Sequence, residues 1–188
     1  MGTYTTLRNH FLIAMPSLLD PNFAQTVTYI CEHSSAGAMG IVINLPLSLR
    51  LREIFQNMNI NSQHEKLNQQ PVLAGGPLQP ERGFVLHPAS NKHWASSLEL
   101  SNKITVTTSR DILEAMADKQ EPPNAIVALG YAAWEGGQLE QEIASNAWLC
   151  GPAEPRILFE VPAAERRAAA AALLGINLHC LSTEAGHA

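Results

Sequence analysis

Alternating side chains mark TVTYICEH (Thr26–His33), which the turn-like SSAG (Ser34–Gly37) joins to MGIVIN (Met39–Asn44). The odd-numbered residues of the first segment, Cys31 and His33 included, share one face of an extended chain, because successive strand side chains point to opposite sides. The β-branched and aromatic residues of both segments favour strands. The stretch therefore predicts a β-hairpin, around which the rest of the fold is arranged.

Further strands and helices follow this hairpin along the chain. Strands are predicted at residues 71–74, 82–87, 97–100, 104–108, 125–129, 156–161 and 176–181. Helices are predicted after Ser48 and Ser109 as N-caps, over residues 138–146, and from Pro162 to the glycine at 175. Residues 59–70 and 130–137 are predicted to be loops. The pattern indicates one α/β domain over residues 1–188, with residues 1–9 and 182–188 as frayed tails.

Size, charge and cysteine usage limit the class of protein. The chain has 188 residues, 46% hydrophobic and 15% charged, as expected of one globular domain. Seventeen acidic and twelve basic residues give a net charge of −5, the wrong sign for binding nucleic acid by bulk charge. Three cysteines do not form a secreted disulfide framework, and FLIAM (residues 11–15) is too short to span a membrane. We therefore expect a cytoplasmic protein without a targeting segment.

Cys31 and His33 form the pair best suited to bind a metal, because both are expected on one strand face. The alternative is a buried thiol beside a hydrogen-bonded histidine, since two ligands alone do not make a metal site. Cys31 also lacks the sequence context of a catalytic cysteine, and a thiol buried in a strand is inert. We expect no metal, no cofactor and no nucleophilic catalysis.

Three further segments can be interpreted either as binding sites or as purely structural features. Gly75–Pro77 matches no phosphate-binding fingerprint and is predicted to be a turn. At Ser109–Asp111 the start of a helix and Arg110 offer an anion site, but the aspartate disfavours one and a solvated helix start is the alternative. Tyr131 and Trp134 either line a pocket or fill the core.

Ten short segments occur in a distinctive order along the chain. They are HFLIAMP (10–16), DPNF (20–23), YICEH (29–33), GAMGIVIN (37–44), GGP (75–77), RGFVLH (82–87), TSRD (108–111), GYAAW (130–134), GQLE (137–140) and NAWL (146–149). Together they resemble the YqgE/AlgH family of bacterial cytoplasmic proteins, in particular its AlgH branch, over nearly the whole chain.

The resemblance implies one domain with a curved, mixed β-sheet flanked by helices. It implies no known reaction and no catalytic residue that can be transferred, and AlgH-like members carry the label of transcriptional regulator through a link to alginate production. Three positions depart from the family pattern: Ala133 where glycine is common, Cys150 where a small polar residue is usual, and Cys31 where an aliphatic residue occurs.

Residues and resemblance together favour a binding or regulatory protein that acts through protein or small-ligand contacts, without direct DNA binding. Its candidate binding residues are Glu32, His33, Arg82, Ser109, Arg110, Asp111, Tyr131, Trp134 and Gln138. One alternative is an enzyme of unknown class, in which Glu32, His33, Arg82, Arg110 and Asp111 would converge on one pocket. The other is a regulator that binds DNA or RNA directly, with salt-sensitive affinity.

Overall fold

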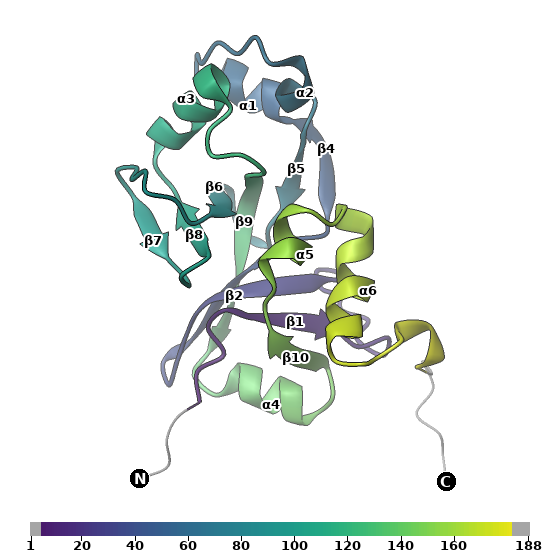
Figure 1. The fold of residues 1–188 in the computed structure, drawn as a ribbon. Helices are drawn as coiled ribbons and strands as arrows, with labels where there is room; N and C mark the ends of the chain where they lie inside the picture. The colour runs from purple at the N-terminus through teal and green to yellow at the C-terminus, as the bar shows by residue number, and fades with distance from the viewer. Residues whose placement is uncertain (1–4, 182–188) are drawn as a thin grey trace, which may run out of the picture.

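One long strand, β9 (Ile126–Glu135), runs through the middle of the sheet in the computed structural model, which describes residues 5–181 (Figure 1). The strand order is β10-β1-β2-β3-β9-β6-β8-β7, with β4 paired to β5 and β5 paired to β9. The β5–β9 pair is parallel and the other pairs are antiparallel. The remaining strands are β1 (His10–Ala14), β2 (Val27–Ser34), β3 (Gly37–Val42), β4 (Pro46–Arg50), β5 (Pro71–Ala74), β6 (Leu78–Pro88), β7 (Ser97–Glu99), β8 (Ile104–Thr107) and β10 (Trp148–Pro152).

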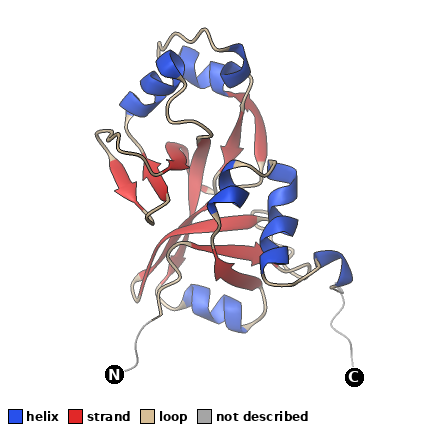
Figure 2. Cartoon of the chain, viewed as in Figure 1, coloured by secondary structure: helices blue, strands red, loops and turns tan. Residues whose placement is uncertain are grey.

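The helices lie at the two ends of the sheet and on one face of it (Figure 2). At the top of Figure 1 are α1 (Leu51–Asn57), α2 (Glu65–Asn68) and α3 (Arg110–Lys119), and at the bottom is α4 (Gln138–Ala144). Helices α5 (Pro155–Phe159) and α6 (Ala163–Leu173) cover one face, where α6 contacts β1, β2 and β10. A 3₁₀ turn, Leu178–Cys180, follows them. Among residues 5–181 no helix is long and apolar enough to cross a membrane.

Alternation along β1 divides the core between two faces of the sheet. Phe11 and Ile13 belong to the cluster that α5 and α6 cover, whereas Leu12 and Ala14 belong to the cluster that contains Leu139 of α4. A third cluster packs α1 and α3 against β5, β6 and β9. The sheet thus supports three groups of buried side chains, each with its own helices.

Strand β9 joins the two parts of the sheet at a glycine. Before Gly130, whose φ is +78°, β9 pairs with β5, and from Ala132 onward it pairs with β3, while β6 pairs with β9 on both sides of this glycine. The turn after β5 passes close to this point, where the Gly75 N–H donates to the Leu129 carbonyl at 2.7 Å. A β-carbon on Gly76, where φ is +156°, would lie 2.1 Å from the carbonyl carbon of Tyr131. Glycine is therefore required where the two chain segments cross.

Much of the predicted fold is confirmed. The structure contains the hairpin of β2 and β3, the strands predicted near residues 71–74, 82–87, 97–100 and 104–108, and the helices predicted after Ser109, at 138–146 and after Pro162. The fold class, one mixed α/β domain with a curved sheet and flanking helices, is confirmed as well.

Two predicted boundaries are wrong, and the predicted loop at 59–70 contains the short helix α2. Residues 130–135 are not a loop, because β9 continues to Glu135 and pairs there with β3. Ser48 is not an N-cap, because it lies in β4 and α1 begins only after Arg50. The Arg50 N–H donates to the Glu53 carboxylate at 2.7 Å, which satisfies a donor at this helix start.

Two strands predicted near the C-terminus are absent among residues 5–181. Residues 156–161 instead contribute to α5, whose first position is Pro155, a place where the missing N–H of proline costs no hydrogen bond. Residues 176–181 contain a 3₁₀ turn, at which the Asn177 side chain accepts a hydrogen bond from the His179 N–H.

The predicted tails differ in outcome. Residues 1–4 and 182–188 lie outside the described residues. Residues 5–9 are attached to β2, because the Leu7 N–H donates to Nδ1 of His33 at 2.8 Å and the Asn9 N–H donates to the Ile30 carbonyl at 2.9 Å. The prediction that residues 1–9 form one frayed tail is therefore too long. We call residues 5–9 the N-terminal strap.

We expect Gly76→Ala to lower the free energy of unfolding by at least about 3 kcal/mol, because its β-carbon would overlap the Tyr131 backbone. Gly83→Ala is the matched control, since a β-carbon there meets only Leu129, at 3.9 Å. The control should change stability by less than about 1 kcal/mol. Urea unfolding of both variants measures the difference, and equal stabilities would contradict the close approach.

Candidate functional site

A cavity of about 510 Å³ opens between β2, β3, β6, β7, β8 and β9. Its wall combines apolar and charged side chains: Met39, Phe84, Leu98 and Val106 together with Glu32 and Arg82. We call it the sheet cavity. Its volume lies within the range of small-molecule sites, and such sites characteristically join an apolar wall to a few polar groups.

Arg82 lies above two aromatic rings of this cavity. Its guanidinium carbon is 5.2 Å from the ring centre of Phe84 and 6.0 Å from that of Tyr131. The two rings pack edge to face, with centres 5.9 Å apart. Arg82 and Phe84 are two residues apart on β6 and so project from the same side of that strand. The rings thereby hold the cation at the cavity while leaving its N–H groups available to a ligand.

Glu32 borders the same cavity from β2, beside a bulge that the sequence pattern did not predict. The pairing of β2 with β3 shifts between Ile30 and Glu32, so Cys31 is the extra residue. Cys31 packs in the cluster with Tyr29, whereas His33 pairs in register with Ala38, which belongs to the cluster of α4. The prediction that Cys31 and His33 share a face is therefore wrong.

The Cys31 thiol is buried and borders the sheet cavity. Burial, with a smaller contribution from the negative charge of Glu32, raises the pKa of this thiol well above its usual range. A protonated thiol is a poor nucleophile and a poor metal ligand. Within residues 5–181, no three histidine, cysteine or acidic side chains are grouped so that they could hold a metal ion.

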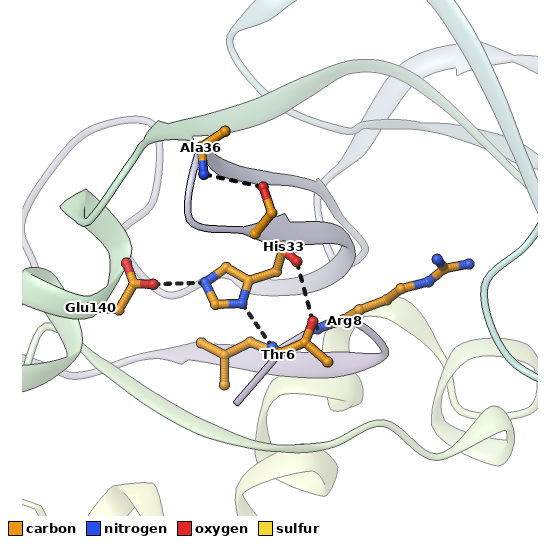
Figure 3. Close-up of polar contacts among 7 residues, drawn as sticks. Thr6, Arg8, His33, Ala36 and Glu140 are labelled. Atoms are coloured by element: carbon orange, nitrogen blue, oxygen red, sulfur yellow. Dashed lines mark hydrogen bonds and ion pairs between the residues drawn. The ribbon is translucent and has the colours of Figure 1, made fainter. Parts of the chain in front are cut away.

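His33 holds the N-terminal strap rather than facing the sheet cavity (Figure 3). Its Nδ1 accepts the Leu7 N–H, so the ring proton of the neutral form is on Nε2, which donates to Glu140 at 2.9 Å. The Thr6 hydroxyl also donates to the His33 carbonyl. The next strap residue, Arg8, donates to the carbonyl of Glu99 on β7 and so links the strap to that edge strand.

Ser109, Arg110 and Asp111 lie at the start of α3, and the first two border a second cavity of about 270 Å³. Asp111 accepts hydrogen bonds from Ser109 and from the Ala95 N–H. Burial acts to raise the pKa of Asp111, but these bonds and those from nearby backbone N–H groups outweigh it and lower the pKa. Arg110 pairs with Glu114 one helical turn later, at 2.7 Å. Through these bonds the segment fastens the loop before β7 to the start of α3.

Trp134 and Gln138 stabilise the packing of α4. The indole N–H groups of Trp134 and Trp148 both donate to Oε2 of Glu142, and the Gln138 amide donates to Oε1 of the same residue. Trp134 is buried, with 5% of its surface exposed, so of the two alternatives for this residue the core position is observed.

The sheet cavity thus brings together three of the nine candidates, Glu32, Arg82 and Tyr131, and a second groove brings together Glu32, His33 and Trp134. The five residues of the enzyme alternative do not converge on one cavity: Glu32 and Arg82 share one, while Arg110 and His33 border others. Sequence reasoning missed Phe84, although its spacing of two from Arg82 on a predicted strand indicates a shared face. No local signal could have indicated Leu98 or Val106, which reach the cavity only through the folding of the sheet.

Comparisons with known proteins agree with this fold. A family model described as AlgH-like matches residues 11–179. UPF0301 proteins of Thioalkalivibrio sulfidiphilus and Nitrosococcus oceani are 54% and 50% identical over 188 residues, which is 100% of both chains in each case. The solution structure of the AlgH protein from Pseudomonas aeruginosa is 49% identical, with a TM-score of 0.78 over 100% of this chain and 99% of that one. A crystal structure from Corynebacterium diphtheriae is 22% identical, with a TM-score of 0.63 over 85% and 83% of the two chains, and shares the fold.

The three cysteines are expected to differ sharply in alkylation by iodoacetamide. Cys180 is exposed and should react at pH 8, whereas Cys31 should not, because burial keeps its thiol protonated. Burial raises the pKa of Cys150 to about 11, so its labelling should increase as the pH approaches that value. Peptide mass mapping measures each site, and urea-unfolded protein is the control in which all three react. Equal rates for Cys31 and Cys180 in the folded protein would contradict the burial.

We expect His33→Ala to release the N-terminal strap, because the Leu7 N–H loses its acceptor on the ring and the ring no longer donates to Glu140. The free energy of unfolding should fall by about 1–3 kcal/mol, and trypsin should cleave faster after Arg8. His93→Ala, at an exposed loop position, is the matched control. Unchanged cleavage in His33→Ala would show that the histidine does not hold the strap.

Proposed function

The chain belongs to the AlgH-like family, and from this premise we propose that it is a binding protein with a regulatory role, whose small ligand occupies the sheet cavity. We propose further that it works in the cytoplasm, which the three free cysteines favour. A regulator of the AlgH type would then act through ligand or protein contacts. The net charge of −5 supports this mode over direct DNA binding.

The observation that carries the proposal is the position of Arg82 over Phe84 and Tyr131. Within residues 5–181 the Arg82 side chain takes part in no ion pair or hydrogen bond. A guanidinium that aromatic rings orient loses little conformational freedom when it binds an anionic group. Such a preorganised cation beside an apolar wall is suited to a small molecule with an anionic end.

Binding is favoured over catalysis by the groups around Arg82. The nearby thiol, Cys31, has a raised pKa and is not activated. The histidine of the candidate set, His33, is occupied by Leu7 and Glu140 and borders a different groove. The cavity therefore offers recognition groups, and the thiol among its lining residues is protonated and not activated.

A ligand in the sheet cavity would also touch the elements that respond to it. Ser97 and Leu98 of β7 border the cavity, and the neighbouring Glu99 carbonyl accepts the hydrogen bond from Arg8 of the strap. Occupancy can thus alter how β7 and the strap are held. This connection supports a regulatory role, because it links the bound state to an outer surface of the protein.

The test is affinity selection of small molecules from an extract of the native cytoplasm, identified by mass spectrometry. The wild-type protein should enrich a compound that carries an anionic group, and Arg82→Gln should retain at least about tenfold less of it, since a charged hydrogen bond is lost. Arg52→Gln is the matched control, because Arg52 pairs with Glu65 on α2, away from the cavity. Equal enrichment by Arg82→Gln, or no enrichment by wild type, would overturn the proposal.

A further inference from the structure

We infer that the sheet cavity binds a zwitterion of dipeptide size, with the ligand carboxylate on Arg82 and its ammonium group on Glu32. This inference rests on the proposed binding function and adds the chemical class of the ligand. It starts from the two charged side chains that border one cavity from different strands.

Both charges are available to a ligand. Neither the Arg82 nor the Glu32 side chain takes part in an ion pair or hydrogen bond within the part of the chain that the structure describes. A second cation, Arg8, donates to the Glu99 carbonyl and does not line this cavity. The cavity therefore presents one positive and one negative group, and a ligand with only negative charge would be repelled by Glu32.

The strand order explains why these two charges do not neutralise each other. Glu32 is on β2 and Arg82 on β6, and β3 and β9 lie between them. Because neighbouring strands are about 4.8 Å apart, β2 and β9 are separated by roughly 10 Å along the sheet. The Arg82 guanidinium lies over Tyr131 of β9, so the distance from the Glu32 backbone to this guanidinium is about the distance from β2 to β9. The Glu32 side chain and the ligand together must cover that distance.

That span selects the size of the ligand. In a free α-amino acid the two charges are adjacent, whereas two extended residues cover roughly 7 Å, which leaves the rest to the Glu32 side chain. The volume of about 510 Å³ accommodates a molecule of this size. The same cavity is lined by Met39, Leu98 and Val106, which suit an apolar side chain, and by the polar residues Ser96 and Thr108, which suit a peptide group.

The experiment is isothermal titration of the full-length protein with the dipeptide Ala-Leu, N-acetyl-Ala-Leu, Ala-Leu amide and free leucine. Wild-type protein should bind Ala-Leu at least about tenfold more tightly than each of the other three, because each analogue loses a charge or the length between charges. Arg82→Gln should bind Ala-Leu and Ala-Leu amide with equal affinity, because the group that binds the carboxylate is gone. Glu32→Gln should bind Ala-Leu and N-acetyl-Ala-Leu with equal affinity, because the group that binds the ammonium is gone.

Arg82→Gln should keep the preference for the free amine, and Glu32→Gln should keep the preference for the acid. A variant that had merely unfolded would lose both preferences, so the two explanations are distinguished. Glu65→Gln, on α2, is the matched control and should keep both preferences. Equal affinity of wild type for the acetylated or amidated dipeptide, or for leucine, overturns the inference. So does the absence of Ala-Leu binding at millimolar concentration. If an Arg82-dependent compound is still enriched from the extract, the proposed function survives that result, and if none is, both fail.

Discussion

The close approach of the Gly75–Gly76 turn to β9 is the constraint on which the rest of the structure depends. Here the backbone of one segment occupies the space that side chains would need in the other. Gly130 lies at the same place, between the residues of β9 that pair with β5 and those that pair with β3. Without this crossing the two parts of the sheet would not share a strand, and the sheet cavity between them would lack its Tyr131 wall.

The predictable part of the fold is the part with strong local patterns. Alternation with β-branched residues located β2 and β3, and capping residues located the start of α3. The failures have physical causes that are not local. The RILFEV segment at 156–161 has strand-like composition, but it packs as α5 against the sheet, and β10 fills the edge position beside β1. At these positions the contacts of the folded protein decided the secondary structure, against the strand propensity of the residues.

The sequence predicted several residues of the candidate site but not how they are arranged in space. Glu32, Arg82 and Tyr131 could be recognised because polar or aromatic residues beside turns are frequent in binding sites. Their meeting depends on strand order, which sequence periodicity does not specify. The single bulge at Cys31 also places His33 on the opposite face of the sheet from the one expected, since one extra residue exchanges the two faces of a strand.

The position of β9 late in the chain also bears on how the protein is synthesised. Its partner β3 is complete long before β9, since Gly37 pairs with Glu135, and β1 waits still longer for β10, with Phe11 opposite Gly151. Sheets with such distant pairings fold slowly, because the chain loses the entropy of a long loop before the stabilising contacts between the strands form. On the ribosome the β2–β3 hairpin would therefore emerge with an unpaired edge. This edge stays unpaired until the last third of the sequence, with β9 at its start, has been translated.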